Sequence, residues 1–175
     1  MTYIIDAHED IACNALAYAR DFHLSAYEIR AREKKDPNIA AVTGEATLGW
    51  DEYQRGKIAV IFASLFLTPQ KYASTPFETQ IFSSPAQAKP LLHRQMDYYS
   101  MLTEGGESFR LIRNKADLAE VITPWAEDRP GRHPVGLVLL LEGAECLEDL
   151  HDLTEYYERG LRIVGPVWSG MRFMG

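Results

Sequence analysis

Two nearly unbroken apolar runs constrain this chain more than any other feature of its sequence. They occupy residues 58–67 and 135–141, and both consist mainly of β-branched, aliphatic or aromatic side chains. Each run has the length of a strand, and a strand that is apolar at nearly every position is buried on both faces. Such strands occur in parallel sheets covered by helices, so the two runs predict an α/β fold.

The segments around these runs alternate between strand and helix patterns. Ser25 and Glu28 form a capping-box pattern, and Asn114 is a favourable N-cap residue for a later helix. Residues 40–50 resemble a surface excursion, and residues 68–85, with three prolines, predict a long loop. We expect helices at 11–20, 26–35, 86–103, 114–126 and 147–157, and shorter strands at 4–5, 109–112 and 161–166.

Charge and cysteine content exclude several classes of partner. The formal net charge is −7, and the longest Lys/Arg cluster lies near residues 30–35, which argues against nucleic acid or an anionic membrane as a partner. Cys13 and Cys146 lie far apart without a CxxC pattern, so we expect neither a disulfide framework nor a zinc knuckle. No signal-peptide or membrane-span pattern is present, which predicts a cytoplasmic protein with a small-molecule or peptide ligand.

Three polar residues stand where predicted strands end. His8 and Asp10 follow the apolar pair Ile4 and Ile5, which suits a buried strand, and Glu142 ends the second long run. Residues two apart on an extended chain point the same way, so His8 and Asp10 can share one ion. In a barrel of parallel strands the functional groups collect at the C-terminal ends. A histidine and two carboxylates at one rim predict a divalent metal site.

The same residues carry a resemblance to a known family. The sequence resembles the membrane (renal) dipeptidase family, the M19 metallopeptidases, in three segments: Asp6 to Asp10, Leu141 to Gly143, and Tyr157 to Trp168. The resemblance implies a (β/α)8 barrel with two zinc ions that hydrolyses dipeptides, including some with a D-residue. It also implies that His8 and Asp10 bind one zinc ion and that Glu142 bridges both.

Two features depart from the family pattern. A (β/α)8 barrel needs about 250 residues, so we expect residues 1–175 to form a single partial domain, the N-terminal half of a TIM-like barrel truncated at its C-terminus. Trp168 stands where the better-known dipeptidases have a substrate-contacting histidine, and it either stacks against a substrate or packs. We expect the other histidines to be surface or packing residues rather than ligands of the second zinc: His23, His93, His133 and His151.

These departures shape the functional expectation. We expect the full-length parent to be a zinc dipeptidase and the isolated chain to have a partial metal site with little or no activity. Exposed edges of a half-barrel favour self-association, such as a homodimer. Two alternatives stay open: a non-catalytic binding or assembly module with the same fold, and an amidohydrolase-like enzyme that acts on a cyclic amide or lactam.

Overall fold

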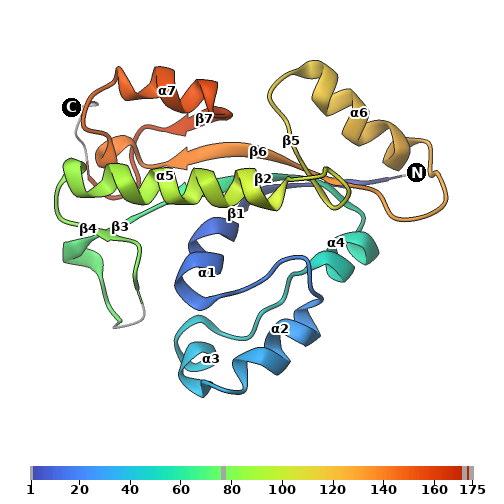
Figure 1. The fold of residues 1–175 in the computed structure, drawn as a ribbon, viewed down its shortest axis with the longest axis horizontal. Coiled ribbons are helices and arrows are strands. Elements are labelled where there is room, and N and C mark those ends of the chain that lie inside the picture. The colour runs from blue at the N-terminus through green and yellow to red at the C-terminus, as the bar shows by residue number, and fades with distance from the viewer. Residues whose placement is uncertain (1, 76–77, 171–172, 174–175) are drawn as a thin grey trace.

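Five strands form one parallel sheet in the computed structural model, which describes residues 2–75, 78–170 and 173. Figure 1 shows the ribbon, with the arrowheads of the two strands latest in the sequence pointing toward the same end of the molecule. The strands of this sheet are β1 (Ile4–Glu9), β2 (Ile58–Phe66), β5 (Phe109–Leu111), β6 (Val135–Glu142) and β7 (Leu161–Gly165).

Strand β6 is the centre of the sheet, because it pairs with three other strands. One edge pairs with β2, from Val60 opposite Gly136 to Phe66 opposite Glu142. The other edge is shared, with β5 beside the first half of β6 and β7 beside its second half. β1 completes the sheet on the far side of β2. All pairings are parallel and helices connect the strands, which confirms the predicted α/β class and gives a partial TIM-barrel-like fold.

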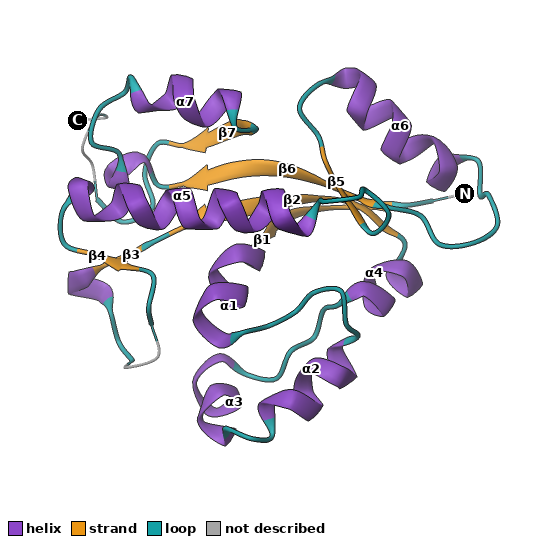
Figure 2. Cartoon of the chain, viewed as in Figure 1, coloured by secondary structure: helices purple, strands orange, loops and turns teal. Residues whose placement is uncertain are grey.

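The helices begin where the sequence supplies caps. The Ser25 side chain accepts from the Glu28 amide while the Glu28 carboxylate accepts from the Ser25 amide, which confirms the predicted capping box. Asn114 likewise caps the helix that follows it. Figure 2 shows the helices in purple. The α-helices are α1 (Ile11–Tyr18), α2 (Ala26–Glu33), α3 (Pro37–Thr43), α4 (Trp50–Gly56), α5 (Pro85–Leu102), α6 (Lys115–Ala126) and α7 (Asp152–Glu158). The 3-10 turns η1 (Gln70–Tyr72) and η2 (Ala144–Cys146) are also present.

Three segments differ from the prediction. Residues 40–50, expected as a surface excursion, include the end of α3 and the start of α4. The expected loop at 68–85 contains a separate parallel ladder of β3 (Thr68–Pro69) and β4 (Ile81–Phe82). The helix expected from 147 begins only at Asp152. There the Asp149 carboxylate accepts from the His151 amide, a local bond that competes with helix formation.

Helix α5 covers the sheet and supplies much of the core. Figures 1 and 2 show it in front of the sheet and roughly parallel to β6, and it contacts α1, β2 and β5. Its residues Leu92, Met96 and Tyr99 are almost completely buried. Each large apolar side chain buried in this way contributes about 1.5–3 kcal/mol. Among the described residues, no helix is long and apolar enough to span a membrane.

Strand β1 is less buried than the sequence predicted. Ile4 and Ile5, expected to be buried, are 49% and 50% exposed. The reason is that β1 lies at the end of the sheet and pairs with β2 along one edge, without a second strand among the described residues. The strand that carries His8 is therefore an edge strand.

Candidate metal centre

A histidine and two carboxylates converge at the C-terminal ends of β1 and β6. His8 Nε2 lies 3.4 Å from Asp10 Oδ1 and 3.0 Å from Glu142 Oε2. One possible ligand atom from each residue lies within 4.8 Å of the other two. Within the described parts of the chain, these residues form a group of side chains that could hold a metal ion. The structure thus brings together the three residues predicted as ligands.

The strand order explains how the ligands meet although β1 and β6 are not neighbours. β2 lies between them, and its residue opposite Glu142 is Phe66. Ser64, two residues earlier on β2, is fully buried and donates a hydrogen bond from Oγ to Asp10 Oδ1. A small hydroxyl side chain on the middle strand therefore anchors Asp10, one of the candidate ligands, which follows the edge strand.

Buried hydrogen bonds also fix the backbone around Asp10. The hydroxyl of Tyr99, on α5, donates to the Ser64 carbonyl at 2.7 Å and accepts from the Ala12 amide at 3.2 Å. Asn14 Nδ2 donates to the Asp10 carbonyl at 2.8 Å. Outer contacts of this kind orient metal ligands and raise metal affinity.

The charges of the group favour a cation. Burial raises the pKa of Glu142, the nearby Asp10 carboxylate raises this pKa further, and the interaction with His8 opposes both effects. The donor set of one imidazole and two carboxylates suits zinc. The separations of 3.4 Å and 3.0 Å from His8 Nε2 to the two carboxylates fit too, because neighbouring ligand atoms of a tetrahedral zinc ion with bonds of about 2.0–2.1 Å lie roughly 3.3 Å apart. The three residues therefore fit one divalent ion.

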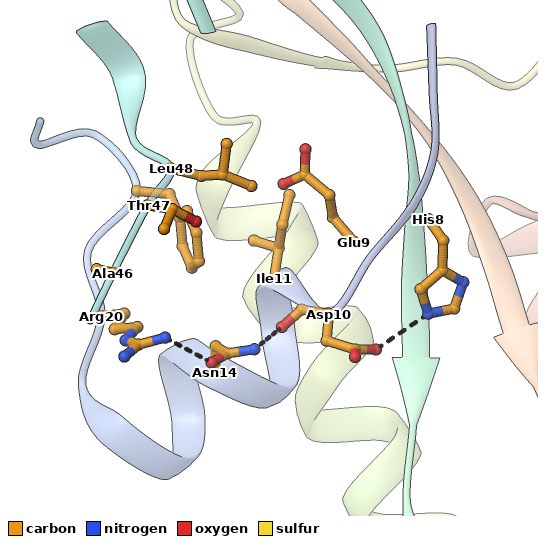
Figure 3. A pocket seen from close by; sticks show the side chains of 10 residues that line it. His8, Glu9, Asp10, Ile11, Asn14, Arg20, Ala46, Thr47 and Leu48 are labelled. Atoms are coloured by element: carbon orange, nitrogen blue, oxygen red, sulfur yellow. Dashed lines mark hydrogen bonds and ion pairs between the residues drawn. The ribbon is translucent and has the colours of Figure 1, made fainter. Parts of the chain in front are cut away.

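Glu9 faces the opposite side of β1 from the His8 ring, as Figure 3 shows. Its Oε2 accepts from the Tyr53 hydroxyl at 2.6 Å. Burial raises the pKa of Glu9 to about 7, with Asp6 and Asp10 adding to the shift and the Tyr53 hydrogen bond opposing it. A cavity of about 230 Å³ adjoins this region, lined by His8, Glu9, Asp10, Ile11, Asn14, Arg20, Phe22, Ala46, Thr47 and Leu48.

The remaining histidines and Cys13 lie outside the group. His23, His93 and His133 each pack edge-on against an aromatic ring, and His151 is exposed. Burial, with the nearby carboxylates of Asp10, Glu78 and Glu142, raises the pKa of Cys13 to about 12. Its thiol therefore stays protonated at neutral pH and is a poor metal ligand.

Trp168 lies beside the candidate metal centre, in the loop that follows β7. Its ring packs edge-on against Phe66 at 5.1 Å and Tyr72 at 5.7 Å between ring centres, yet it is 41% exposed. Gly143, next to Glu142, has φ +88°, and a Cβ on it would lie 2.9 Å from Trp168 Cβ. A glycine is needed there both for its backbone conformation and for the close approach of Trp168.

Three supporting residues were not predicted from the sequence. The sequence does set Ser64 apart as a possible polar contact, because it is the hydroxyl residue of an otherwise apolar run. It gives no such signal for Tyr99, because a helix aromatic most often serves the core. Glu145, three residues after Glu142, accepts from the amides of Trp168 and Ser169. Its role depends on a contact between distant segments, which sequence spacing does not reveal.

Comparisons with known proteins find a likeness in fold to a solved structure and a distant likeness in sequence to one protein. No protein-family model matches the chain. An uncharacterised protein in the PQQ-III 3′ region of Acinetobacter calcoaceticus is 28% identical over 123 residues, which cover 66% of this chain and 36% of that protein. A solved structure titled dipeptidase AC, a metallopeptidase of family M19, aligns with a TM-score of 0.56 and 20% identity over 95% of this chain and 43% of that one.

The likeness to the solved structure establishes a shared class of fold, a parallel α/β arrangement of the kind found in that M19 metallopeptidase. The chain spans less than half the length of each of these proteins. Activity, substrate and partners are therefore matters of proposal.

Proposed function

We propose that this chain belongs to a zinc-dependent dipeptidase related to the M19 metallopeptidases. The observation that carries the proposal is the convergence of His8, Asp10 and Glu142, from strands separated by β2, at one end of a parallel sheet. The resemblance of the motifs around these residues and the fold of the solved M19 dipeptidase support the same assignment.

The residues of this chain would have separate roles in binding the metal and in orienting its ligands. His8 and Asp10 would hold a zinc ion from β1, and Glu142 would hold it from β6, at the position where the family resemblance implies a bridging carboxylate. Bound zinc would activate water and polarise the scissile carbonyl. Ser64 would keep the Asp10 carboxylate turned toward the ion, and Asn14 would hold the Asp10 backbone.

Zinc binding and hydrolysis test the proposal. After treatment with a chelator, the protein should take up zinc stoichiometrically, measured by calorimetry and elemental analysis. His8→Ala and Glu142→Gln should weaken zinc binding by more than the roughly 10–100-fold that loss of an outer-shell contact causes. The matched controls are His93→Ala and Glu155→Gln, which alter a His–Glu pair at 3.2 Å outside the predicted centre and should leave zinc affinity unchanged.

Hydrolysis of dipeptides with L- and D-residues should depend on the same metal. We expect a rate below the range of about 1–1,000 s⁻¹ typical of enzymes, because the three ligands suffice for one of the two ions that the resemblance implies. Absence of stoichiometric zinc would contradict the metal site. Zinc binding without hydrolysis would favour the non-catalytic binding module, and hydrolysis of cyclic amides alone would favour the amidohydrolase alternative.

A further inference from the structure

Three aromatic residues form a partly exposed surface beside the metal centre, which we name the aromatic wall: Phe66, Tyr72 and Trp168. Trp168 is the middle ring and contacts both others edge-on. Lys71 Nζ lies 4.6 Å from the centre of the Tyr72 ring and covers one side of it. Trp168 is 41% exposed and Tyr72 is 44% exposed, so both residues offer open surface to a ligand.

The aromatic wall adjoins the metal centre directly. Phe66 is the β2 partner of Glu142 in the sheet. On the other side, Trp168 Cβ is so close to the Gly143 backbone that a side chain at Gly143 would collide with it. One metal ligand thus lies between two segments that carry rings of the wall, so a group bound at the metal has an apolar surface next to it.

Hydrogen bonds hold Trp168 in this position. The Glu145 carboxylate accepts from the amide of Trp168 at 3.3 Å and from the amide of Ser169 at 2.9 Å. The Tyr72 hydroxyl donates to the Ser169 carbonyl at 3.3 Å. Glu145 is therefore a positioning residue for the wall, because it fixes the backbone that carries the Trp168 ring.

We propose that the aromatic wall binds an aromatic side chain of the substrate and makes the site selective for dipeptides that contain a phenylalanine-like residue. The inference rests on the proposed function. An exposed apolar surface next to a few polar groups suits a small ligand with one apolar and one polar end. Aromatic pairs also attract each other beyond the effect of buried area, and three rings in edge contact offer both ring faces and edges.

Equilibrium binding of two uncleavable probes tests this selectivity. The probes are reduced-amide analogues of Gly-Phe and Gly-Ala, in which a methyleneamine replaces the scissile amide. By calorimetry on the zinc-loaded protein, the Phe analogue should bind about tenfold more tightly than the Ala analogue. Trp168→Ala should bring this ratio close to one, and Trp168→Phe should keep most of it. Tyr27→Ala, which removes an aromatic ring that is 66% exposed on α2, is the matched control and should keep the full ratio.

Variants at Glu145 test the positioning role. Glu145→Ala should reduce the Phe-to-Ala ratio, and Glu145→Gln should restore part of it because an amide oxygen still accepts a hydrogen bond from the backbone. Circular dichroism would check that each variant is folded. A ratio near one in the wild type, or a ratio unchanged in Trp168→Ala, would overturn the inference.

Zinc titration of the same samples separates this inference from the proposed function. If zinc binds and the Phe analogue has no advantage, only the aromatic wall is refuted. If the wild type fails to bind zinc, the proposed function fails. The ratio measured on the metal-free protein then still decides whether the wall binds an aromatic ring.

Discussion

Ser64 is a buried hydroxyl residue of a core strand that contacts one residue of the candidate metal centre. It is fully buried, donates to Asp10 and has its own carbonyl tied to Tyr99. Ser64→Ala should leave the fold intact and weaken zinc binding about 10–100-fold, because the Asp10 carboxylate loses its orienting partner. The measurement is competition with a zinc-binding dye.

The control for this prediction is Ser100→Ala, which removes a hydroxyl that bonds within α5. It should not change zinc affinity. An unchanged zinc affinity in Ser64→Ala would show that Asp10 is either not a ligand or is oriented by its backbone alone.

Glu9 makes stability depend on pH. Its pKa is raised from 4.5 to about 7 in the folded protein, so folding favours the protonated form. The stability that this proton contributes is complete below pH 4.5 and is lost as the pH rises through 7, a change of about 3 kcal/mol. Urea unfolding of the metal-free protein should therefore show stability falling across this range, and Glu9→Gln should remove most of the fall.

A chelator must be present in the Glu9 experiment so that metal uptake by His8 and Asp10 does not add its own pH dependence. Glu28→Gln is a useful comparison, because the pKa of Glu28 is lowered by its hydrogen bonds to Ser25 and its linkage has the opposite sign. An identical pH profile for Glu9→Gln and the wild type would contradict the assignment.

At the scale of elements, the sequence predicted a helix or strand best where its apolar pattern was long or where a specific residue capped a helix. β2, β6, α5 and α6 were predicted to within a few residues, because long apolar runs, helical periodicity and Asn114 leave few alternatives. β3 and β4 were missed because two-residue strands have no periodicity, and they exist through pairing with each other. Ile4 and Ile5 were wrongly expected to be buried, because sequence shows the polarity of a strand but not its place in the sheet.

The candidate site likewise combines residues that a local sequence signal reveals with residues whose role depends on the folded structure. His8, Asp10 and Glu142 could be predicted because each stands at a strand end, and strand ends meet in a parallel sheet. Glu145 and Tyr99 could not, because each acts through contact with a segment far away in the sequence.

A substitution at Gly136 would test how closely β6 packs against Ile112 and against Val121 of α6. A Cβ at this position of β6 would lie 2.3 Å from Ile112 Cδ1 and 3.0 Å from Val121 Cγ1, so these two buried side chains would have to move. Gly136→Ala should lower the free energy of unfolding by about 1–3 kcal/mol, the usual cost of overpacking. Gly56→Ala is the matched control, because a Cβ there meets only ordinary contacts at 3.5 Å or more. Chemical denaturation measures both, and equal stability for the two variants would contradict the close packing.

At the scale of the whole molecule, the candidate metal centre and the open edge of the sheet share strand β1. β1 presents His8 and leads into Asp10 at one end, and it exposes Ile4 and Ile5 at the other. Unpaired backbone groups on an edge strand next to apolar side chains favour pairing with another chain. We propose that this edge pairs with the β1 edge of a second copy, because identical edges can pair across a two-fold axis.

Sedimentation velocity tests this association. The wild type should form dimers as the protein concentration rises, and added salt should strengthen dimerisation because it screens the repulsion between two copies of charge −7. Ile5→Lys should shift the protein toward the monomer, because it places a charge on the edge that must be desolvated. Met101→Lys is the control, because it alters an exposed apolar residue of α5 that is 60% exposed and lies off this edge. If Ile5→Lys leaves the dimer unaffected, the interface lies elsewhere. If the wild type is a monomer at every concentration, the proposed dimer is wrong.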